Sequence, residues 1–176
     1  MKALLLMCLF LTFNSEIVIC DFTSLKETNK WYQTSDDVMG GISKSEMLHK
    51  SEGVGVFTGE VSTANNGGFA MTRLPVDIKL TNKVKKIVLR VKGDGKMYQF
   101  RIKANSGQRY WYVYKFLTTT EMEEIEIPLE KFYPSYRGYR LNKNNFSSNT
   151  IKEIGILIGN KKSEDFKLII DKISIK

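Results

Sequence analysis

The sequence predicts an all-β domain, a β-sandwich or jelly roll, and two observations carry that prediction. Apolar and polar residues alternate with a period of two over most of the chain, which is typical of strands with one buried face. Gly, Asn and Asp residues divide this pattern into at least eight short segments. Strands and helices do not alternate along the chain, so a parallel nucleotide-binding sheet is not indicated. Only Phe22–Trp31 has a weakly helical pattern.

The clearest strand of the first half is Lys85–Lys92, after further predicted strands at Val54–Val61 and Phe69–Leu74. Ile87, Leu89 and Val91 share one face, and Lys86, Arg90 and Lys92 are among the residues of the other. Gly93-Asp94-Gly95 follows, and an Asp-Gly turn of this kind predicts a tight hairpin to the next strand. In that next strand the inward positions are Tyr98, Phe100 and Ile102, and the outward ones are Gln99, Arg101 and Lys103.

The predicted strand Arg109–Phe116 carries aromatic residues on one face and Trp111, Val113 and Lys115 on the other. If these three strands are neighbours, basic and aromatic side chains share one outward face: Arg90, Lys92, Gln99, Arg101, Lys103, Trp111 and Lys115. Such a face suits a glycan, an acidic peptide or a nucleic-acid strand. The alternative is an ordinary solvated face on which a loop covers Trp111.

The remaining predicted strands are Glu123–Leu129, Ile154–Ile158 and Phe166–Ile175. In the last one the apolar parity changes between Ile170 and Ile173, which predicts a β-bulge near Asp171-Lys172.

The first twenty residues have the pattern of a signal peptide. Lys2 precedes the eleven-residue apolar run Ala3–Phe13, which is too short to span a bilayer. We therefore expect cleavage after Cys20, export to a bacterial envelope or the medium, and a mature domain of residues 21–176 without a transmembrane span. Lipid attachment at Cys20 is the alternative.

Composition excludes several classes of site. Both cysteines, Cys8 and Cys20, lie in the predicted signal peptide, and His49 is the only histidine, so no disulfide, thiolate metal site or zinc centre is expected; these counts leave calcium in a loop open. The net charge is +8 and comes mostly from lysines spread along the chain. A dispersed lysine surface more often reflects solubility than phosphate binding, and it favours acidic partners or anionic membrane surfaces; no nucleic-acid ligand is expected. No cofactor is expected.

Two loops hold further candidate site residues. In the stretch Trp31–Ser45, Asp36 and Asp37 precede Gly40 and Gly41. Turn chemistry alone explains these residue types, and a ligand loop that uses the carboxylate of Asp37 is the sharper alternative. The second loop, Lys131–Gly138, offers Tyr136 and Arg137 for recognition beside Trp111 and Arg101, or plugs one edge of the core.

No nucleophile, base and orienting group fall into a catalytic arrangement around His49, so the chain is not expected to be an enzyme. An enzyme that uses the Asp36-Asp37 loop is a third alternative.

Several motifs resemble the thirty-kilodalton complex I intermediate-associated protein family. The resemblance covers nearly the whole predicted mature chain, in family order: Trp31 with Ser35–Ser43, Phe57-Thr58-Gly59, Asn66–Ala70 with Arg73, Gly93–Lys96 with Tyr98, Ile127-Pro128-Leu129, Phe132–Gly138, Ile154-Gly155-Ile156 and Phe166-Lys167-Leu168.

This resemblance implies a galactose-binding-like jelly roll and a non-catalytic protein-binding module of the assembly-factor kind. The predicted signal peptide differs from the N-terminus expected of a mitochondrial assembly factor. The alternative is a carbohydrate-binding module, for which Trp111, Tyr136 and nearby arginines are the candidate residues. The protein partner and the glycan stay alternatives at this point.

Overall fold

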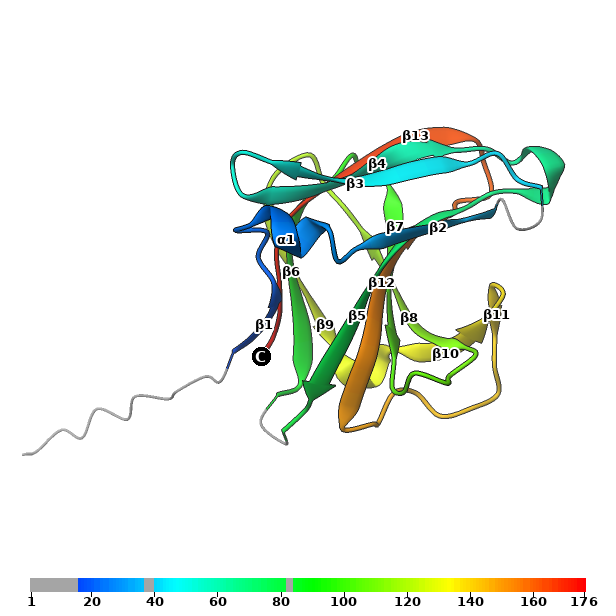
Figure 1. The fold of residues 1–176 in the computed structure, drawn as a ribbon. Helices are drawn as coiled ribbons and strands as arrows, with labels where there is room; N and C mark the ends of the chain where they lie inside the picture. The colour runs from blue at the N-terminus through cyan, green and yellow to red at the C-terminus, as the bar shows by residue number, and fades with distance from the viewer. Residues whose placement is uncertain (1–15, 37–39, 82–83) are drawn as a thin grey trace, which may run out of the picture.

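The computed structural model describes residues 16–36, 40–81 and 84–176. Two antiparallel sheets face each other, which confirms the predicted all-β sandwich (Figure 1). The strands are β1 (Ile17–Cys20), β2 (Tyr32–Ser35), β3 (Lys44–Lys50), β4 (Val54–Val61), β5 (Ala70–Lys79), β6 (Lys86–Lys92), β7 (Met97–Lys103), β8 (Trp111–Leu117), β9 (Glu123–Pro128), β10 (Tyr133–Tyr136), β11 (Tyr139–Arg140), β12 (Thr150–Ile158) and β13 (Glu164–Ile175). The short helix α1 (Leu25–Thr28) lies within the segment expected to be weakly helical.

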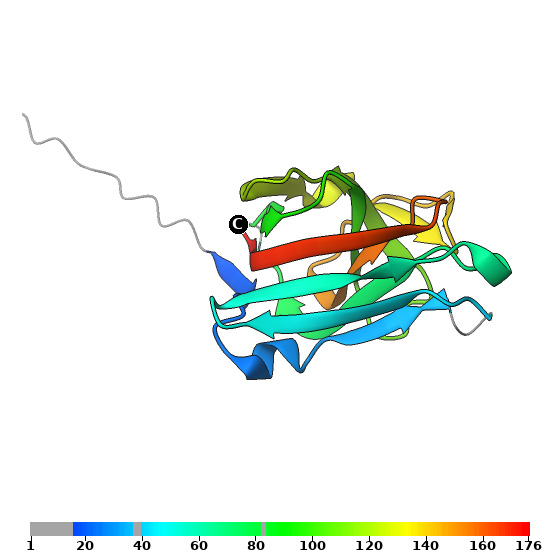
Figure 2. The same cartoon turned by 90° about the horizontal axis from the view of Figure 1, so that it is seen from above.

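The six-stranded sheet runs in the order β3-β4-β13-β6-β9. Seen from above, β3, β4 and β13 lie side by side (Figure 2). β1 pairs with the last residues of β13, beyond the part of β13 that pairs with β4. The seven-stranded sheet runs in the order β11-β10-β8-β7-β12-β5-β2.

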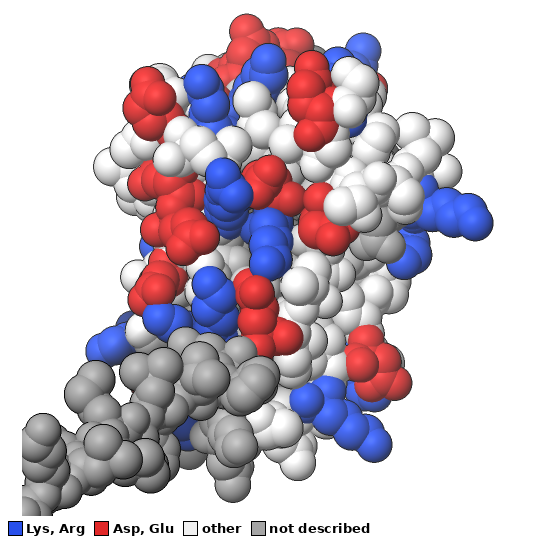
Figure 3. Space-filling view, turned by 90° about the vertical axis from the view of Figure 1, so that its left-hand side faces the viewer, with Lys and Arg blue, Asp and Glu red and all other residues white. Residues whose placement is uncertain are grey.

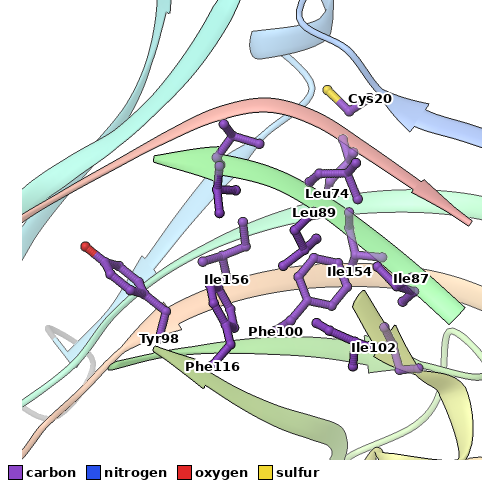
Figure 4. Packing of buried hydrophobic residues seen from close by; sticks show 14 of the residues in the cluster. Cys20, Leu74, Ile87, Leu89, Tyr98, Phe100, Ile102, Phe116, Ile154 and Ile156 are labelled. Carbon is purple, nitrogen blue, oxygen red and sulfur yellow. The ribbon is translucent and has the colours of Figure 1, made fainter. Parts of the chain in front are cut away.

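The core lies between the two sheets and consists of the inward residues of each strand (Figure 4). Tyr98, Phe100 and Ile102 of β7 are fully buried, as their alternation predicts. They meet Ile87 and Leu89 of β6, which point in from the opposite sheet. Each fully buried side chain of this size stabilises the fold by about 1.5–3 kcal/mol relative to exposure.

The predicted hairpin at Gly93-Asp94-Gly95 is wrong. β6 pairs with β13 and β9, whereas β7 pairs with β8 and β12, so this turn carries the chain from one sheet to the other. Asp94 holds the crossing in place, because its carboxylate accepts hydrogen bonds from the Lys167 backbone N–H of β13 and from the Tyr98 hydroxyl of β7. Arg90 and Lys92 consequently lie on the six-stranded sheet and do not share a face with Trp111.

The β-bulge in the last strand is confirmed. The pairing of β13 with β6 shifts register between Ile170 and Lys172. Phe166, Leu168 and Ile170 before the shift and Ile173 and Ile175 after it are all buried. The extra residue therefore lets both halves of a long strand face the same core.

The predicted signal-peptide boundary at residue 20 coincides with the end of β1. Ile17 pairs with Ile175 of β13, and Cys20 is buried in the core. The Glu16 carboxylate forms an ion pair with Lys172, whose Nζ lies 2.9 Å away. A chain that begins at Asp21 lacks all of these contacts, and the boundary itself stays a prediction.

Within the described residues, no helix has the length and apolar character needed to cross a bilayer.

Candidate functional site

The outer face of the seven-stranded sheet, which is the side turned away from the six-stranded sheet, carries a cluster of aromatic and charged side chains. Cross-strand partners in a sheet project to the same side. The pairing registers therefore place one row of residues across six strands on this face: Tyr32, Arg73, Gly155, Arg101, Val113 and Tyr133. A second row includes Glu153, Lys103, Trp111, Ser135 and Arg140.

Glu153 is the acidic centre of this face. Its Oε1 atom accepts hydrogen bonds from the Tyr32 hydroxyl and from Arg73 Nε at 2.8 Å, and it pairs with Arg73 Nη2 at 2.6 Å. Its Oε2 atom lies 2.8 Å from Lys103 Nζ. Glu153 has the parity of Gly155 and alternates with the buried Ile154, which puts its carboxylate on the outer face, just after a register shift between Ile151 and Glu153. One carboxylate thus binds side chains from β2, β5 and β7.

The charge of Glu153 is fixed by these partners. Burial alone would raise the pKa of the Glu153 carboxyl, but hydrogen bonds from Lys103 and Tyr32, together with the charges of Arg73 and Lys103, hold this pKa below its usual range. Burial, with the hydrogen bond to Glu153, raises the pKa of Tyr32 to about 12. Glu153 is therefore an ionised structural acceptor at neutral pH and neither gives nor takes a proton there.

Trp111 lies among the cations of this cluster. Lys103 Nζ lies 4.5 Å and Arg73 Cζ lies 5.3 Å from the centre of the Trp111 ring, within cation–π distance. The indole lies beside Gly155, where a Cβ atom would be 3.6 Å from Trp111 Cη2, an ordinary van der Waals contact. The ring accordingly extends from β8 across β7 to β12.

Cations also lie over two tyrosine rings of the outer face. Arg73 Cζ lies 4.9 Å from the ring centre of Tyr32, and Arg140 Cζ lies 5.0 Å from that of Tyr133. Each ring holds a guanidinium group in place by its attraction for the cation. The outer face therefore presents positive charges that are held in position over aromatic rings.

Arg101 occupies the middle of the row and is half-buried. Its Nε and Nη2 atoms donate hydrogen bonds to the side-chain oxygen of Gln99, at 3.2 and 2.7 Å. Burial lowers the pKa of the Arg101 guanidinium to about 10, against an opposing electrostatic contribution from Tyr133. Within residues 16–36, 40–81 and 84–176, no carboxylate forms an ion pair with Arg101.

The structure brings together two of the candidate residues from the sequence and separates the others. Trp111 and Arg101 share the outer face. Tyr136 follows Ser135 in β10 and so has the opposite parity, which puts it on the other side of that strand, with Arg137 Cζ 5.6 Å from its ring centre. Arg137 lies in the turn before β11, at a φ of 49°. Asp37 lies outside the described residues.

Tyr32, Glu153 and Tyr133 were not among the candidates from the sequence. The signal for Glu153 is a single acidic residue next to the apolar run Ile154–Ile158, because a buried carboxylate needs partners. Tyr32 and Tyr133 carry no comparable signal, since an aromatic residue in a strand suits the core equally well.

The loop around Asp36 is closed by its own hydrogen bonds. Asp36 is buried, and its carboxylate accepts bonds from the Ser43 hydroxyl and the Gly68 N–H, each at 2.6 Å, and from the N–H groups of Ser43 and Phe69. Burial raises the pKa of Asp36, but these donors outweigh it and lower the pKa. A Cβ atom at Gly41 would overlap Asp36 Oδ1, and Gly40 has a φ of 85°. The glycines thus let the chain close around the carboxylate.

These donors leave no room for a cation at the Asp36 carboxylate, because N–H and O–H groups surround it. Elsewhere in the described part of the chain, no cluster of three or more His, Cys, Asp or Glu side chains is arranged to hold a metal ion.

Comparison with known proteins gives one family and one fold. Residues 20–170 match the family model described as Complex I intermediate-associated protein 30. Among solved structures, the family 11 carbohydrate-binding module of the cellulosomal cellulase Lic26A-Cel5E of Clostridium thermocellum has a TM-score of 0.70 at 19% identity, covering 92% of this chain and 94% of that module. The same type of module from Clostridium thermocellum, in complex with a β-1,3-1,4-mixed-linked tetrasaccharide, has a TM-score of 0.68 at 20% identity, with 91% and 94% coverage.

The agarase AgWH50C has a TM-score of 0.62 at 9% identity, and 92% of this chain covers 24% of the agarase. Because these sequence identities are low, the structural similarity shows a shared fold and nothing more. It confirms the galactose-binding-like jelly roll.

Proposed function

The chain belongs to the complex I intermediate-associated protein 30 family, and from this premise we propose that it is an exported, non-catalytic binding module of the assembly-factor kind. The module binds an acidic region of a protein partner through the outer face of the seven-stranded sheet.

The arrangement of cations on aromatic rings supports this proposal most directly. Tyr32, Trp111 and Tyr133 each have a Lys or Arg group within 5.3 Å of the ring centre. The hydrogen bonds to Glu153 fix Arg73 and Lys103 in position. A preorganised set of cations loses little side-chain entropy when an acidic surface binds, which favours affinity.

The side of the molecule drawn to the left in Figure 1 has a different charge pattern. There, Lys and Arg side chains alternate with Asp and Glu (Figure 3). The pairs Lys86–Glu126, Arg90–Asp171 and Lys172–Glu16 of the six-stranded sheet illustrate this balance. Surface pairs of this kind contribute little to stability and leave little net charge to attract a partner. The charge distribution therefore favours the outer face as the binding surface.

Export is the second part of the proposal and is supported by the apolar run Ala3–Phe13 after Lys2. An exported member of this family would act on a partner of the cell envelope.

Crosslinked affinity capture of C-terminally tagged protein from its native host, followed by mass spectrometry, tests the function. The proposal predicts reproducible recovery of one envelope protein or complex. Recovery of no protein above the untagged background contradicts it.

Carbohydrate binding is the second candidate, because Trp111 presents a large ring on a sheet face of a jelly roll. Sugar rings stack on open aromatic faces, whereas the rings described here carry cations, and this ranks the glycan second. A panel of neutral and acidic glycans tested against the full chain and Trp111→Ala decides this candidate. It is overturned when no glycan binds or when Trp111→Ala binds as the original protein does.

A further inference from the structure

The cations of the outer face differ in how their charge is balanced. Arg73 and Lys103 share the carboxylate of Glu153. Arg101 and Arg140, on the β7 and β11 side of the same face, form no ion pair with any carboxylate in the part of the chain that the structure describes. The positive charge of these two arginines is therefore left for a group from outside the chain.

The guanidinium group of Arg101 has N–H donors that no described side chain uses. Gln99 accepts from Nε and from one hydrogen of Nη2, which leaves both hydrogens of Nη1 and the second hydrogen of Nη2 without an acceptor among the described side chains. Gln99 supplies only a dipole, which offsets part of the cost of burying a guanidinium group. A half-buried guanidinium with unused, coplanar donors is suited to a carboxylate, which accepts two parallel N–H bonds.

Arg140 provides a second cation close to Arg101. Tyr133 is paired with Val113, and Val113 is paired with Arg101, so two strand spacings of about 4.8 Å separate the backbones of β10 and β7. The guanidinium of Arg140 lies over the Tyr133 ring, and so it is held above the strand between the sheet edge and Arg101. Both side chains are long enough to meet one ligand group near the Tyr133 ring.

We propose that Arg101 and Arg140 form a carboxylate-binding subsite on either side of Tyr133, and that its occupant is an Asp- or Glu-containing segment of the protein partner. This inference rests on the proposed function and names the chemistry that the partner presents. Charge complementarity identifies the occupant as acidic, and the cations that cover the rings favour a peptide side chain over a stacked sugar.

The test measures binding of a fluorescein-labelled oligoglutamate peptide to the full chain by fluorescence anisotropy. Loss of one charge-assisted bidentate contact predicts that Arg101→Gln weakens binding about tenfold or more. Arg101→Lys keeps the charge but loses the planar fork, so it should recover only part of the affinity. Arg90→Gln, which removes the same charge from the six-stranded sheet, is the matched control and should change affinity by less than about twofold.

Circular dichroism and thermal melting show whether each variant is folded. A second measurement needs no variant: backbone amide chemical shifts of the unmodified protein, recorded with the same peptide, should change most at Arg101, Tyr133 and Arg140. Equal affinities of Arg101→Gln and Arg90→Gln, or shift changes confined to the six-stranded sheet, overturn the inference.

Polygalacturonate serves as the acidic glycan probe. Binding of polygalacturonate through Arg101, with no binding of oligoglutamate, overturns the peptide occupant and moves the subsite to an acidic glycan. A partner captured equally by the original protein and by Arg101→Gln overturns the subsite and leaves the proposed function standing. Failure to capture any partner together with failure to bind oligoglutamate overturns both.

Discussion

The hydroxyl group of Tyr32 donates a hydrogen bond to the carboxylate of Glu153, which lies 121 residues later in the chain. β5 separates their strands, and Arg73 of β5 binds the same carboxylate oxygen. Three strands are thus joined on the outer face by polar contacts, in addition to the apolar core on the other side. The positions of Arg73 and Lys103 over Trp111 depend on this junction.

Glu153→Gln should destabilise the protein by about 2–3 kcal/mol, because Arg73 and Lys103 lose their carboxylate. Chemical denaturation at neutral pH measures this loss. Tyr32→Phe removes only one neutral donor and should cost about 1 kcal/mol, which makes it the graded control. Equal stability of Glu153→Gln and the original protein would show that the cluster contributes nothing to the fold.

The contribution of Glu153 should also depend on pH. Its pKa in the folded protein lies below the usual value of 4.5, so the carboxylate stabilises the fold above about pH 4.5 and this stabilisation is lost as pH falls through the folded pKa. The difference in unfolding free energy between the original protein and Glu153→Gln should be constant near neutral pH and shrink below about pH 4.5. Asp36, whose pKa is also lowered, remains in both proteins and cancels in the difference. A difference that grows on acidification would contradict this assignment.

Gly41→Ala should destabilise the fold because its methyl group would overlap the Asp36 carboxylate. Overpacking of this kind costs about 1–3 kcal/mol. Asp36→Ala should cost about 3 kcal/mol, since the N–H groups of Gly68 and Phe69 lose a charged acceptor. In the double variant the overlaps with Asp36 Oδ1 and Cγ, at 2.2 and 2.3 Å, are removed and only the Asp36 Cβ remains close, at 2.8 Å. The clash is therefore reduced, so the combined cost should be less than the sum of the two single costs. Strict additivity in a double-mutant cycle would mean that the two residues do not meet.

Removal of β1 should lower stability. A chain that starts at Asp21 loses the pairing of Ile17 with Ile175, the buried Cys20 side chain and the Glu16–Lys172 pair. Compared with a chain that starts at Glu16, the loss should be roughly 2–4 kcal/mol. Thermal melting of both proteins measures it, and equal melting temperatures would show that β1 adds nothing. The N-terminal residue of the exported protein, read by mass spectrometry, tests the predicted boundary after Cys20 directly.

Eight strands, β4 to β9, β12 and β13, could be predicted from the sequence because their apolar residues alternate locally, whereas β1, β2, β3, β10 and β11 were not predicted. Tyr98, Phe100 and Ile102 share one parity, and their burial follows from it. The parity change between Ile170 and Ile173 likewise predicts the bulge. The family resemblance was confirmed over residues 20–170.

The pairing of strands could not be predicted in the same way. The turn Gly93-Asp94-Gly95 has the composition of a hairpin, but Asp94 binds the Lys167 N–H and the Tyr98 hydroxyl, and the chain crosses between sheets. The face that Arg101 and Trp111 share could be predicted, because their strands are neighbours and each alternates regularly. Glu153 and Tyr32 were missed because their contact requires the order β12-β5-β2, which no local pattern contains.

The central claim is that the outer face of the seven-stranded sheet binds a protein partner. The most direct test places a photo-crosslinking amino acid at Lys115, which is exposed and paired with Gln99 on the outer face, and in a separate protein at Arg90 of the six-stranded sheet. Irradiation in the native host should give a specific crosslinked partner from the Lys115 position and none from the Arg90 position. A partner crosslinked from Arg90 alone would contradict the claim and place binding on the other sheet.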